Sequence, residues 1–193
     1  MIAGAMQALT VGDPRDLATD TGPVIDAPAR AALEEHVAWL NKNARRICRL
    51  ELSPATRHGD FVPPAFYEIK SLSQLNRENF GPILHVVRFP AEDLGKVVDA
   101  INATGYGLTI GLQSRIDSVR DFVEQRARVG NFYVNRNQIG AVVESQPFGG
   151  EGLSGTGPKA GGPHYVARFA TERVTCIDTT AAGGNASLMA ALE

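Results

Sequence analysis

The chain has 193 residues, and its 19 Lys and Arg against 21 Asp and Glu give a formal net charge of −2. That length suits one ordinary domain or a piece of a larger protein, and 44% apolar with 21% charged residues is a globular composition rather than a disordered one. Near-neutral charge excludes the broad basic surface of a dedicated nucleic-acid-binding protein. The longest apolar runs, such as residues 83–87, are far too short to cross a bilayer.

Cysteine and histidine usage indicates neither a disulfide framework nor a metal centre. The two cysteines are Cys48 and Cys176, too few for either. The four histidines lie far apart in the sequence, without paired ligand spacing. Residues 1–10 have no signal-peptide pattern and resemble the second half of a helix. We therefore expect no metal and a reducing, cytoplasmic setting.

The first half of the chain predicts one long helix and three strands. Asp26 is a helix N-cap residue and Pro28 suits the first turn of that helix. Strands are expected at 47–52, 65–69 and 83–89. The last is an almost continuous apolar run, which is typical of a strand buried on both faces. The helix has an apolar stripe at helical spacing, formed by Leu33, His36, Val37, Leu40 and Ala44.

Two strand-and-helix units follow. Helices are predicted at 91–103 and 117–127, and strands at 108–113 and 131–135. Helices of about a dozen residues between strands favour parallel crossover connections. The sequence therefore predicts an α/β fold with a parallel or mixed sheet and flanking helices.

From residue 139 onward the chain becomes rich in glycine. Gly150, Gly152 and Gly155 fit the spacing G-x-G-x-x-G, which in a dinucleotide-binding unit joins a strand directly to a helix. Here the preceding strand ends some fifteen residues earlier, and Pro158 and Pro163 oppose a following helix. A phosphate-binding turn stays open as an alternative, but we favour an ordered loop whose glycines permit positive φ and close backbone approach.

The segment 129–162, VGNFYVNRNQIGAVVESQPFGGEGLSGTGPKAGG, resembles the C-terminal active-site region of the aldehyde dehydrogenase family. More narrowly, it resembles the L-glutamate γ-semialdehyde (1-pyrroline-5-carboxylate) dehydrogenase part of bacterial bifunctional proline utilisation A enzymes. The resemblance continues through ENFGPILHVVRF from residue 78, GDP at 12–14, GPVID at 22–26, and AAGGNASLMA in the tail. It implies an α/β fold that is part of an aldehyde dehydrogenase catalytic domain.

This resemblance assigns cofactor-binding residues. In the family an E-x-F-G-P segment holds the nicotinamide end of NAD, and Glu78 and Phe80 occupy those positions. A carboxylate accepts hydrogen bonds from ribose hydroxyls, and a phenyl ring offers an apolar wall that positions the nicotinamide. Without the resemblance, Glu78 reads as a solvated loop acid and Phe80 as a core residue.

The resemblance also implies substrate-binding residues. Backbone N–H groups at Gly140 and Ala141 correspond to the family's capture site for the substrate carboxylate, and such groups form an anion-binding concavity without a fixed charge. Phe148 corresponds to an aromatic wall that shields the aliphatic part of glutamate semialdehyde. The alternative is that Phe148 only anchors a loop. Asn135 and Arg136 precede this loop and are candidates to orient it.

The family's nucleophilic cysteine lies in a GQxC-like segment that precedes the region matched here, and neither Cys48 nor Cys176 has that context. We therefore expect no catalytic residue in this chain. The resemblance implies that the chain is a C-terminal fragment, which is inactive alone. It is expected to work with an upstream half that carries the nucleophile and the dinucleotide-binding domain. FAD belongs only to an upstream domain of the parent enzyme. The resemblance places that parent in the bacterial cytoplasm and leaves room for peripheral membrane attachment.

Three regions are predicted. Residues 1–138 form part of the catalytic domain, 139–165 form the glycine-rich substrate-anchor region, and 166–193 form an oligomerisation strand, expected at 173–178, and a tail. A homo-oligomer formed through that strand is expected, and poor solubility of the isolated piece with it. Two alternatives stay open: a non-catalytic structural or oligomerisation module, and another aldehyde dehydrogenase subclass.

Overall fold

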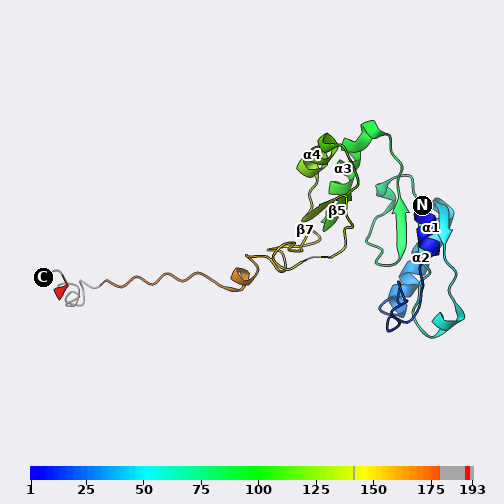
Figure 1. The fold of residues 1–193 in the computed structure, drawn as a ribbon, viewed down its shortest axis with the longest axis horizontal. Coiled ribbons are helices and arrows are strands. Elements are labelled where there is room, and N and C mark those ends of the chain that lie inside the picture. The colour runs from blue at the N-terminus through cyan, green and yellow to red at the C-terminus, as the bar shows by residue number, and fades with distance from the viewer. Residues whose placement is uncertain (141, 179–189, 192–193) are drawn as a thin grey trace. The chain divides into compact units, whose positions relative to one another are not determined.

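The structure is a computed structural model that describes residues 1–140, 142–178 and 190–191 (Figure 1). It divides into two compact units, and each is described by itself. The first comprises Met1–Gly105 with Gln125–Ala127, and the second comprises Tyr106–Glu124 with Arg128–Glu193.

A three-stranded mixed sheet organises the first unit. Its strands are β1 (Arg45–Arg49), β2 (Ala65–Glu68) and β3 (Ile83–Val86), in the order β1-β2-β3. β1 runs antiparallel to β2, and β2 runs parallel to β3. The helices are α1 (Ile2–Gln7), α2 (Ala27–Asn43) and α3 (Leu94–Ala103), and short 3₁₀ turns lie at Pro54–His58, Leu72–Gln74 and Ala91–Asp93.

The core of the first unit lies where α2 covers one face of the sheet. As predicted, Asp26 caps this helix, and its carboxylate accepts a 2.8 Å hydrogen bond from the Ala29 N–H. The buried side of α2 carries Leu33, His36, Val37 and Leu40. Alternate residues of a strand share one face, and Ala65, Tyr67 and Ile69 accordingly form a buried cluster with Leu40.

The opposite face of β3 is partly open. Leu84 is 43% exposed, although the apolar run at 83–89 predicts burial on both faces. That prediction is wrong for this chain, because α2 covers only the face that carries Ile83, His85 and Val87. β3 also ends at Val86, shorter than expected.

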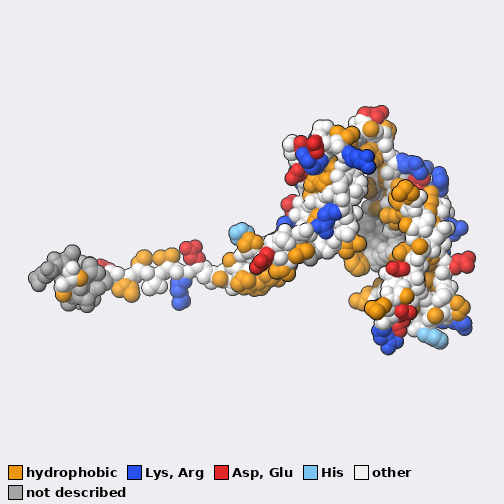
Figure 2. Space-filling model, in the orientation of Figure 1, with side chains coloured by type: hydrophobic (Ala, Val, Ile, Leu, Met, Phe, Trp, Pro, Cys, Tyr) orange, Lys and Arg blue, Asp and Glu red, His pale blue; other side chains and the backbone are white. Residues whose placement is uncertain are grey.

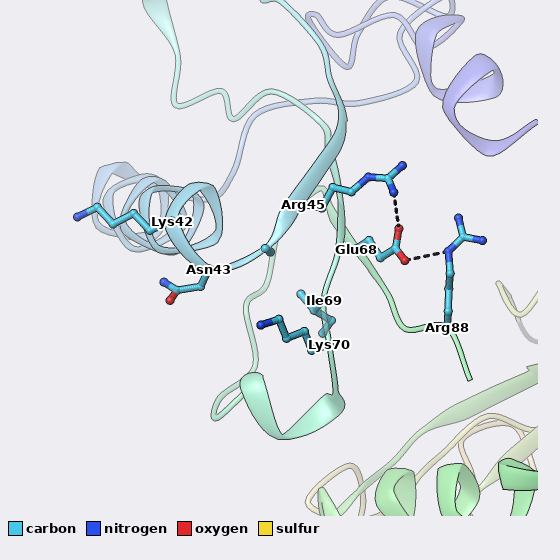
Figure 3. Close-up of a pocket in the computed structure, with 8 residues that line it drawn as sticks. Lys42, Asn43, Arg45, Glu68, Ile69, Lys70 and Arg88 are labelled. Atoms are coloured by element: carbon cyan, nitrogen blue, oxygen red, sulfur yellow. Dashed lines mark hydrogen bonds and ion pairs between the residues drawn. The ribbon is translucent and has the colours of Figure 1, made fainter. Parts of the chain in front are cut away.

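Glu68 at the end of β2 joins β1 to the chain that follows β3 (Figure 3). Its carboxylate lies 2.8 Å from Arg88 Nε and 3.6 Å from Arg45 Nη1. Lys42 and Lys70 also line the hollow beside this group. Both arginines are largely exposed, so each ion pair contributes little stability, on the order of 0–1 kcal/mol.

The second unit contains a parallel crossover. β5 (Thr109–Leu112) and β6 (Asn131–Val134) pair in parallel, and α4 (Asp117–Arg126) connects them, although its last two residues group with the first unit. β4 (Tyr106–Gly107) pairs antiparallel with β7 (Glu151–Gly152), and a 3₁₀ turn spans Val166–Phe169. This mixture of helices with parallel and antiparallel strands confirms the α/β prediction. Gly152 ends β7 and leads into turns rather than a helix.

The strand expected at 173–178 is absent from the described chain. Residues 171–178 carry no assigned secondary structure, and Val174 and Ile177 are 77% and 80% exposed. A strand requires hydrogen bonds to a neighbouring strand, so an apolar β-forming segment stays extended where none is offered. Figure 2 shows hydrophobic side chains at the surface along this part of the chain. The predicted tail beyond residue 178 lies almost wholly outside the described residues.

Across the described residues, no helix is both long and apolar enough to span a membrane.

Gly130 offers a test of the second unit. A Cβ atom built on Gly130, just before β6, falls on the carbonyl oxygen of Gly149. We expect Gly130→Ala to lower the free energy of unfolding by about 1–3 kcal/mol, because two backbone segments must separate. The control is Gly157→Ala, whose Cβ meets only Nε of the Arg168 side chain, at 3.9 Å. Urea unfolding followed by circular dichroism measures both, and equal midpoints for the two variants would contradict this packing.

Candidate functional site

The residues singled out by the sequence lie in both units. Glu78 and Phe80 belong to the first unit, in the segment 76–82 between the 3₁₀ turn Leu72–Gln74 and β3. Gly140 and Phe148 belong to the second unit, and Ala141 lies outside the described residues. The residues expected to contact cofactor and those expected to contact substrate therefore lie in different units. We call the segment 76–82 the cofactor side and the loop after β6 the substrate side, after these expectations, and describe each separately.

On the cofactor side, the segment 76–82 presents the side chains of Glu78 and Phe80 outward. Glu78 is exposed, and Phe80 is 86% exposed although it is a large apolar residue. Gly81, by contrast, presses against α2, because a Cβ there would collide with the side chain of Leu33. A ring held at the surface beside a tightly packed glycine is free to face a planar ligand.

On the substrate side, the hydroxyl of Tyr133 in β6 anchors Gly140. Tyr133 is buried, and its OH donates a 3.2 Å hydrogen bond to the carbonyl oxygen of Gly140. Gly140 has φ of +86°, in the left-handed region that favours glycine. Nothing lies within 4 Å of a Cβ built there, so the conformation rather than the space calls for glycine.

Arg136 holds the loop that follows β6. Its guanidinium lies 4.4 Å from the centre of the Tyr133 ring, which supports a cation–π contact. Nη1 donates a 2.6 Å hydrogen bond to Gln146 Oε1, and Nε donates a 3.0 Å bond to the carbonyl of Asn137. The two ends of the loop are thereby tied to one side chain, and the antiparallel bridge between Val142 and Gln146 closes it.

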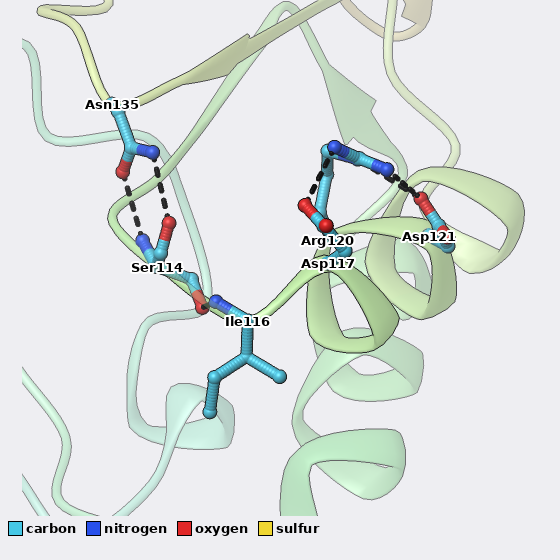
Figure 4. Close-up of polar contacts among 6 residues, drawn as sticks. All are labelled: Ser114, Ile116, Asp117, Arg120, Asp121 and Asn135. Atoms are coloured by element: carbon cyan, nitrogen blue, oxygen red, sulfur yellow. Dashed lines mark hydrogen bonds and ion pairs between the residues drawn. The ribbon is translucent and has the colours of Figure 1, made fainter.

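Asn135 fixes the chain where β6 ends (Figure 4). Its φ of +55° is left-handed, a conformation that asparagine tolerates better than most residues. Its side-chain amide donates a 2.8 Å bond to the Ser114 carbonyl and accepts a 3.0 Å bond from the Ser114 N–H. Asn135 therefore ties the end of β6 to the loop after β5 and sets the direction in which Arg136 leaves the strand.

The backbone around Phe148 is held from two sides. Phe148 exchanges both hydrogen bonds with Ala160, at 2.9 and 3.0 Å. The Asn131 amide donates to the Pro147 carbonyl at 2.9 Å and accepts from the Gly149 N–H at 3.2 Å. Lys159 Nζ donates to the carbonyls of Gly149 at 2.8 Å and of Gly130 at 2.6 Å. Phe148, itself half-buried, thus stands on a backbone with little freedom.

Sequence reasoning missed Asn131, Tyr133 and Lys159. Asn131 and Tyr133 are two residues apart in a strand, so they share the face that meets the glycine-rich loop. The signal available in the sequence was Asn131, a polar residue at the start of a predicted strand close to the glycine-rich loop. The role of Lys159 had no such signal, because its acceptors are backbone carbonyls distant in sequence.

The two cysteines belong to neither the segment 76–82 nor the loop after β6. Cys48 is half-buried on β1 in the first unit, and Cys176 is exposed in the second. Nowhere in the described ranges do three His, Cys, Asp or Glu side chains gather closely enough to hold a metal ion.

Comparison with known proteins matches residues 1–175 to the Aldehyde dehydrogenase family. The bifunctional protein PutA of Klebsiella aerogenes is 50% identical over 178 residues, covering 90% of this chain and 14% of that protein. The mitochondrial delta-1-pyrroline-5-carboxylate dehydrogenase of Homo sapiens is 34% identical over 179 residues, covering 86% of this chain and 31% of that protein.

Solved structures agree. A Bradyrhizobium japonicum proline utilization A (PutA) mutant matches with a TM-score of 0.86 at 54% identity, over 94% of this chain and 18% of that one. A 1-pyrroline-5-carboxylate dehydrogenase from Thermus with bound NAD matches with a TM-score of 0.76 at 31% identity, over 86% of this chain and 32% of that one. The chain thus spans less than a third of the length of these relatives, and its fold is that of a partial aldehyde dehydrogenase domain. On this evidence the chain belongs to the aldehyde dehydrogenase family.

Proposed function

We propose that this chain is the C-terminal part of an NAD-dependent dehydrogenase that oxidises L-glutamate γ-semialdehyde to L-glutamate in proline catabolism. The observation that carries the proposal is its 50% identity to a bifunctional PutA protein over 90% of the chain. Relatives named 1-pyrroline-5-carboxylate dehydrogenase support the same substrate class. In this proposal the chain supplies one wall of the substrate pocket and the nicotinamide side of the cofactor site.

The cofactor side fits a nicotinamide ribose. The Glu78 carboxylate is exposed and able to accept two hydroxyl hydrogen bonds, and the exposed Phe80 ring offers a flat apolar surface two residues away. Bound NAD⁺ supplies the hydride acceptor for aldehyde oxidation. The role of this chain is to orient that acceptor, since hydride transfer requires close and aligned approach.

The substrate side fits a carboxylate held by backbone rather than by a cation. In this proposal the N–H groups of Gly140 and of the next residue, Ala141, bind the anion, and the left-handed φ of Gly140 supports such a backbone site. The nearby Arg136 guanidinium is already engaged by Gln146 and Asn137, so its part is to shape the loop. Phe148 covers the aliphatic middle of the substrate and excludes water there.

The remaining chemistry is assigned to the upstream half of the parent enzyme. That half contributes the nucleophilic cysteine, the dinucleotide-binding domain and, in a bifunctional parent, the FAD-dependent proline dehydrogenase. The proposed setting is the bacterial cytoplasm.

A second role, contact between copies of the protein, is favoured by one observation. Val166, Phe169, Val174 and Ile177 are all at least 77% exposed in a single stretch of chain. The proposal is that this stretch adds a strand to a neighbouring copy, and light scattering of the parent-length enzyme with and without residues 170–178 reports it as a change in mass.

The function is tested by chimera. The chain alone and the chain substituted for the matching C-terminal segment of the Klebsiella aerogenes PutA protein are given glutamate semialdehyde and NAD⁺, and NADH is followed by absorbance. We expect turnover from the chimera and none from the folded chain alone. Robust turnover by the isolated chain would make Cys48 or Cys176 the nucleophile, and a folded but inactive chimera would refute the proposed activity.

Arg136 gives a finer prediction in the same chimera. Arg136→Leu frees the loop ends, and we expect KM for the semialdehyde to rise roughly tenfold, as lost hydrogen bonds of about 1 kcal/mol each imply. Arg136→Lys keeps the charge without the planar fork and should be nearly as impaired. Arg115→Leu, at an exposed arginine of the same unit, is the control. A wild-type KM for Arg136→Lys would mean that charge, not loop shape, matters.

A further inference from the structure

Two histidines from different elements of the first unit share a direct hydrogen bond. His36 Nε2 on α2 lies 2.8 Å from His85 Nε2 on β3. His36 is only 8% exposed, and its ring stacks on Trp39 with the centroids 6.1 Å apart. Neither residue belongs to the proposed cofactor or substrate contacts. A partly buried pair of imidazoles therefore joins the helix to the strand.

The His36–His85 pair lies next to the segment 76–82, which carries Glu78 and Phe80. One helical turn before His36, Leu33 contacts Gly81 so closely that a Cβ there would collide with it. β3 begins two residues after Gly81 and reaches His85 after two more. The same face of α2 thus holds the segment and the start of β3 together.

The same helix, α2, makes a further contact with the segment 76–82. Glu35 lies 3.6 Å from Arg77 in an exposed ion pair. Glu35, His36, Trp39 and Arg77, with Gln74 and Asn76, line a cavity of about 320 Å³. Because water reaches this cavity, a proton can reach His36 without unfolding of the helix.

The Nε2–Nε2 contact depends on the protonation of both rings. Between neutral imidazoles one nitrogen donates its proton and the other accepts it. One added proton leaves a bond but puts a cation into a buried site, and a second proton leaves two donors facing each other. The hydrogen bond between the two rings therefore forms when both are neutral, is weakened when one ring is protonated, and is lost when both are protonated.

The charged and titratable groups around the pair favour the neutral state. Burial lowers the pKa of His85 to about 4, with His36 as a smaller cause, and burial followed by the Arg77 charge lowers the pKa of His36. Glu35 faces Arg77, and Tyr67, the β2 register partner of His85, directs its hydroxyl to Asn41. Since folding depresses these histidine pKa values below 6.5, the contact is fully stabilising above that pH and is lost as pH falls toward 4.

We infer that the His36–His85 contact is a latch that positions the segment 76–82, closed while both rings are neutral and released when both are protonated. Its consequence for NAD⁺ rests on the proposed function: as the latch opens, Glu78 and Phe80 lose their fixed position and cofactor binding weakens. His36 and His85 are positioning residues that act through this segment.

The latch itself is tested on the 193-residue chain without any cofactor. Amide hydrogen exchange, corrected for intrinsic rates, gives protection factors at pH 7.5 and pH 5 for Ile83 and Ala65, whose N–H groups donate to the carbonyls of Gly81 at 2.8 Å and of Pro82 at 2.9 Å. We expect protection to fall roughly tenfold or more at pH 5 in the wild-type chain, as the depressed histidine pKa values imply. His85→Gln keeps a hydrogen-bonding partner for His36 and removes one titrating ring, so its protection should change less than about threefold.

The control is His58→Gln, at an exposed histidine, which should behave as wild type. Equal losses in wild type and His85→Gln, or no loss in wild type, would overturn the latch. If His85→Gln fails to fold, NMR titration of the wild-type chain still decides: two of its four imidazoles must titrate below pH 6.5 in a coupled manner, and four ordinary titrations would refute the pair.

A second measurement separates this inference from the proposed function. The dissociation constant for NAD⁺ is measured on the PutA chimera at both pH values, with and without His85→Gln. Weaker binding at pH 5 that His85→Gln relieves supports both. If exchange shows the latch opening while NAD⁺ affinity stays constant, the latch stands and the cofactor role of Glu78 and Phe80 fails.

Discussion

The substrate side depends on one constraint, the need of a glycine-rich loop to find hydrogen-bond partners for its backbone. Residues 137–140 and 142–149 form almost no regular structure, so side chains must satisfy those groups. β6 supplies them: Asn131 brackets Phe148, Tyr133 holds the Gly140 carbonyl, and Arg136 ties the loop ends. The side chains of the short strand β6 thus fix the conformation of a loop that has almost no regular structure of its own.

The cofactor side is held in place by different contacts. There α2 covers the β2–β3 pair with apolar packing. The exposed segment 76–82 is held where Gly81 meets Leu33, where Arg77 pairs with Glu35 and where the Pro82 carbonyl accepts from the Ala65 N–H, and the His36–His85 contact follows directly after it. Exposed functional side chains on a rigid base cost little stability and keep their orientation. The partly buried imidazole pair makes this side of the structure sensitive to protons.

Local sequence patterns predicted the helices and strands but not the segments that pack against them. The cap at Asp26, the stripe Leu33–Leu40 and the alternation of helices with strands appear where they were expected, because they follow from short-range periodicity. Burial of both faces of β3 and a strand at 173–178 do not, since each requires a neighbour that periodicity cannot supply. The roles of Lys159 and the His36–His85 pair likewise arise from contacts distant in sequence.

The central claim is that this loop presents backbone N–H groups to a substrate carboxylate, and substitution at Ala141 tests it most directly. In the PutA chimera, Ala141→Leu adds bulk at the residue after Gly140 without removing any charge. The account predicts a large loss of kcat/KM for glutamate semialdehyde, with turnover of an aliphatic aldehyde that lacks a carboxylate preserved. Equal losses for both aldehydes would contradict carboxylate anchoring at this loop.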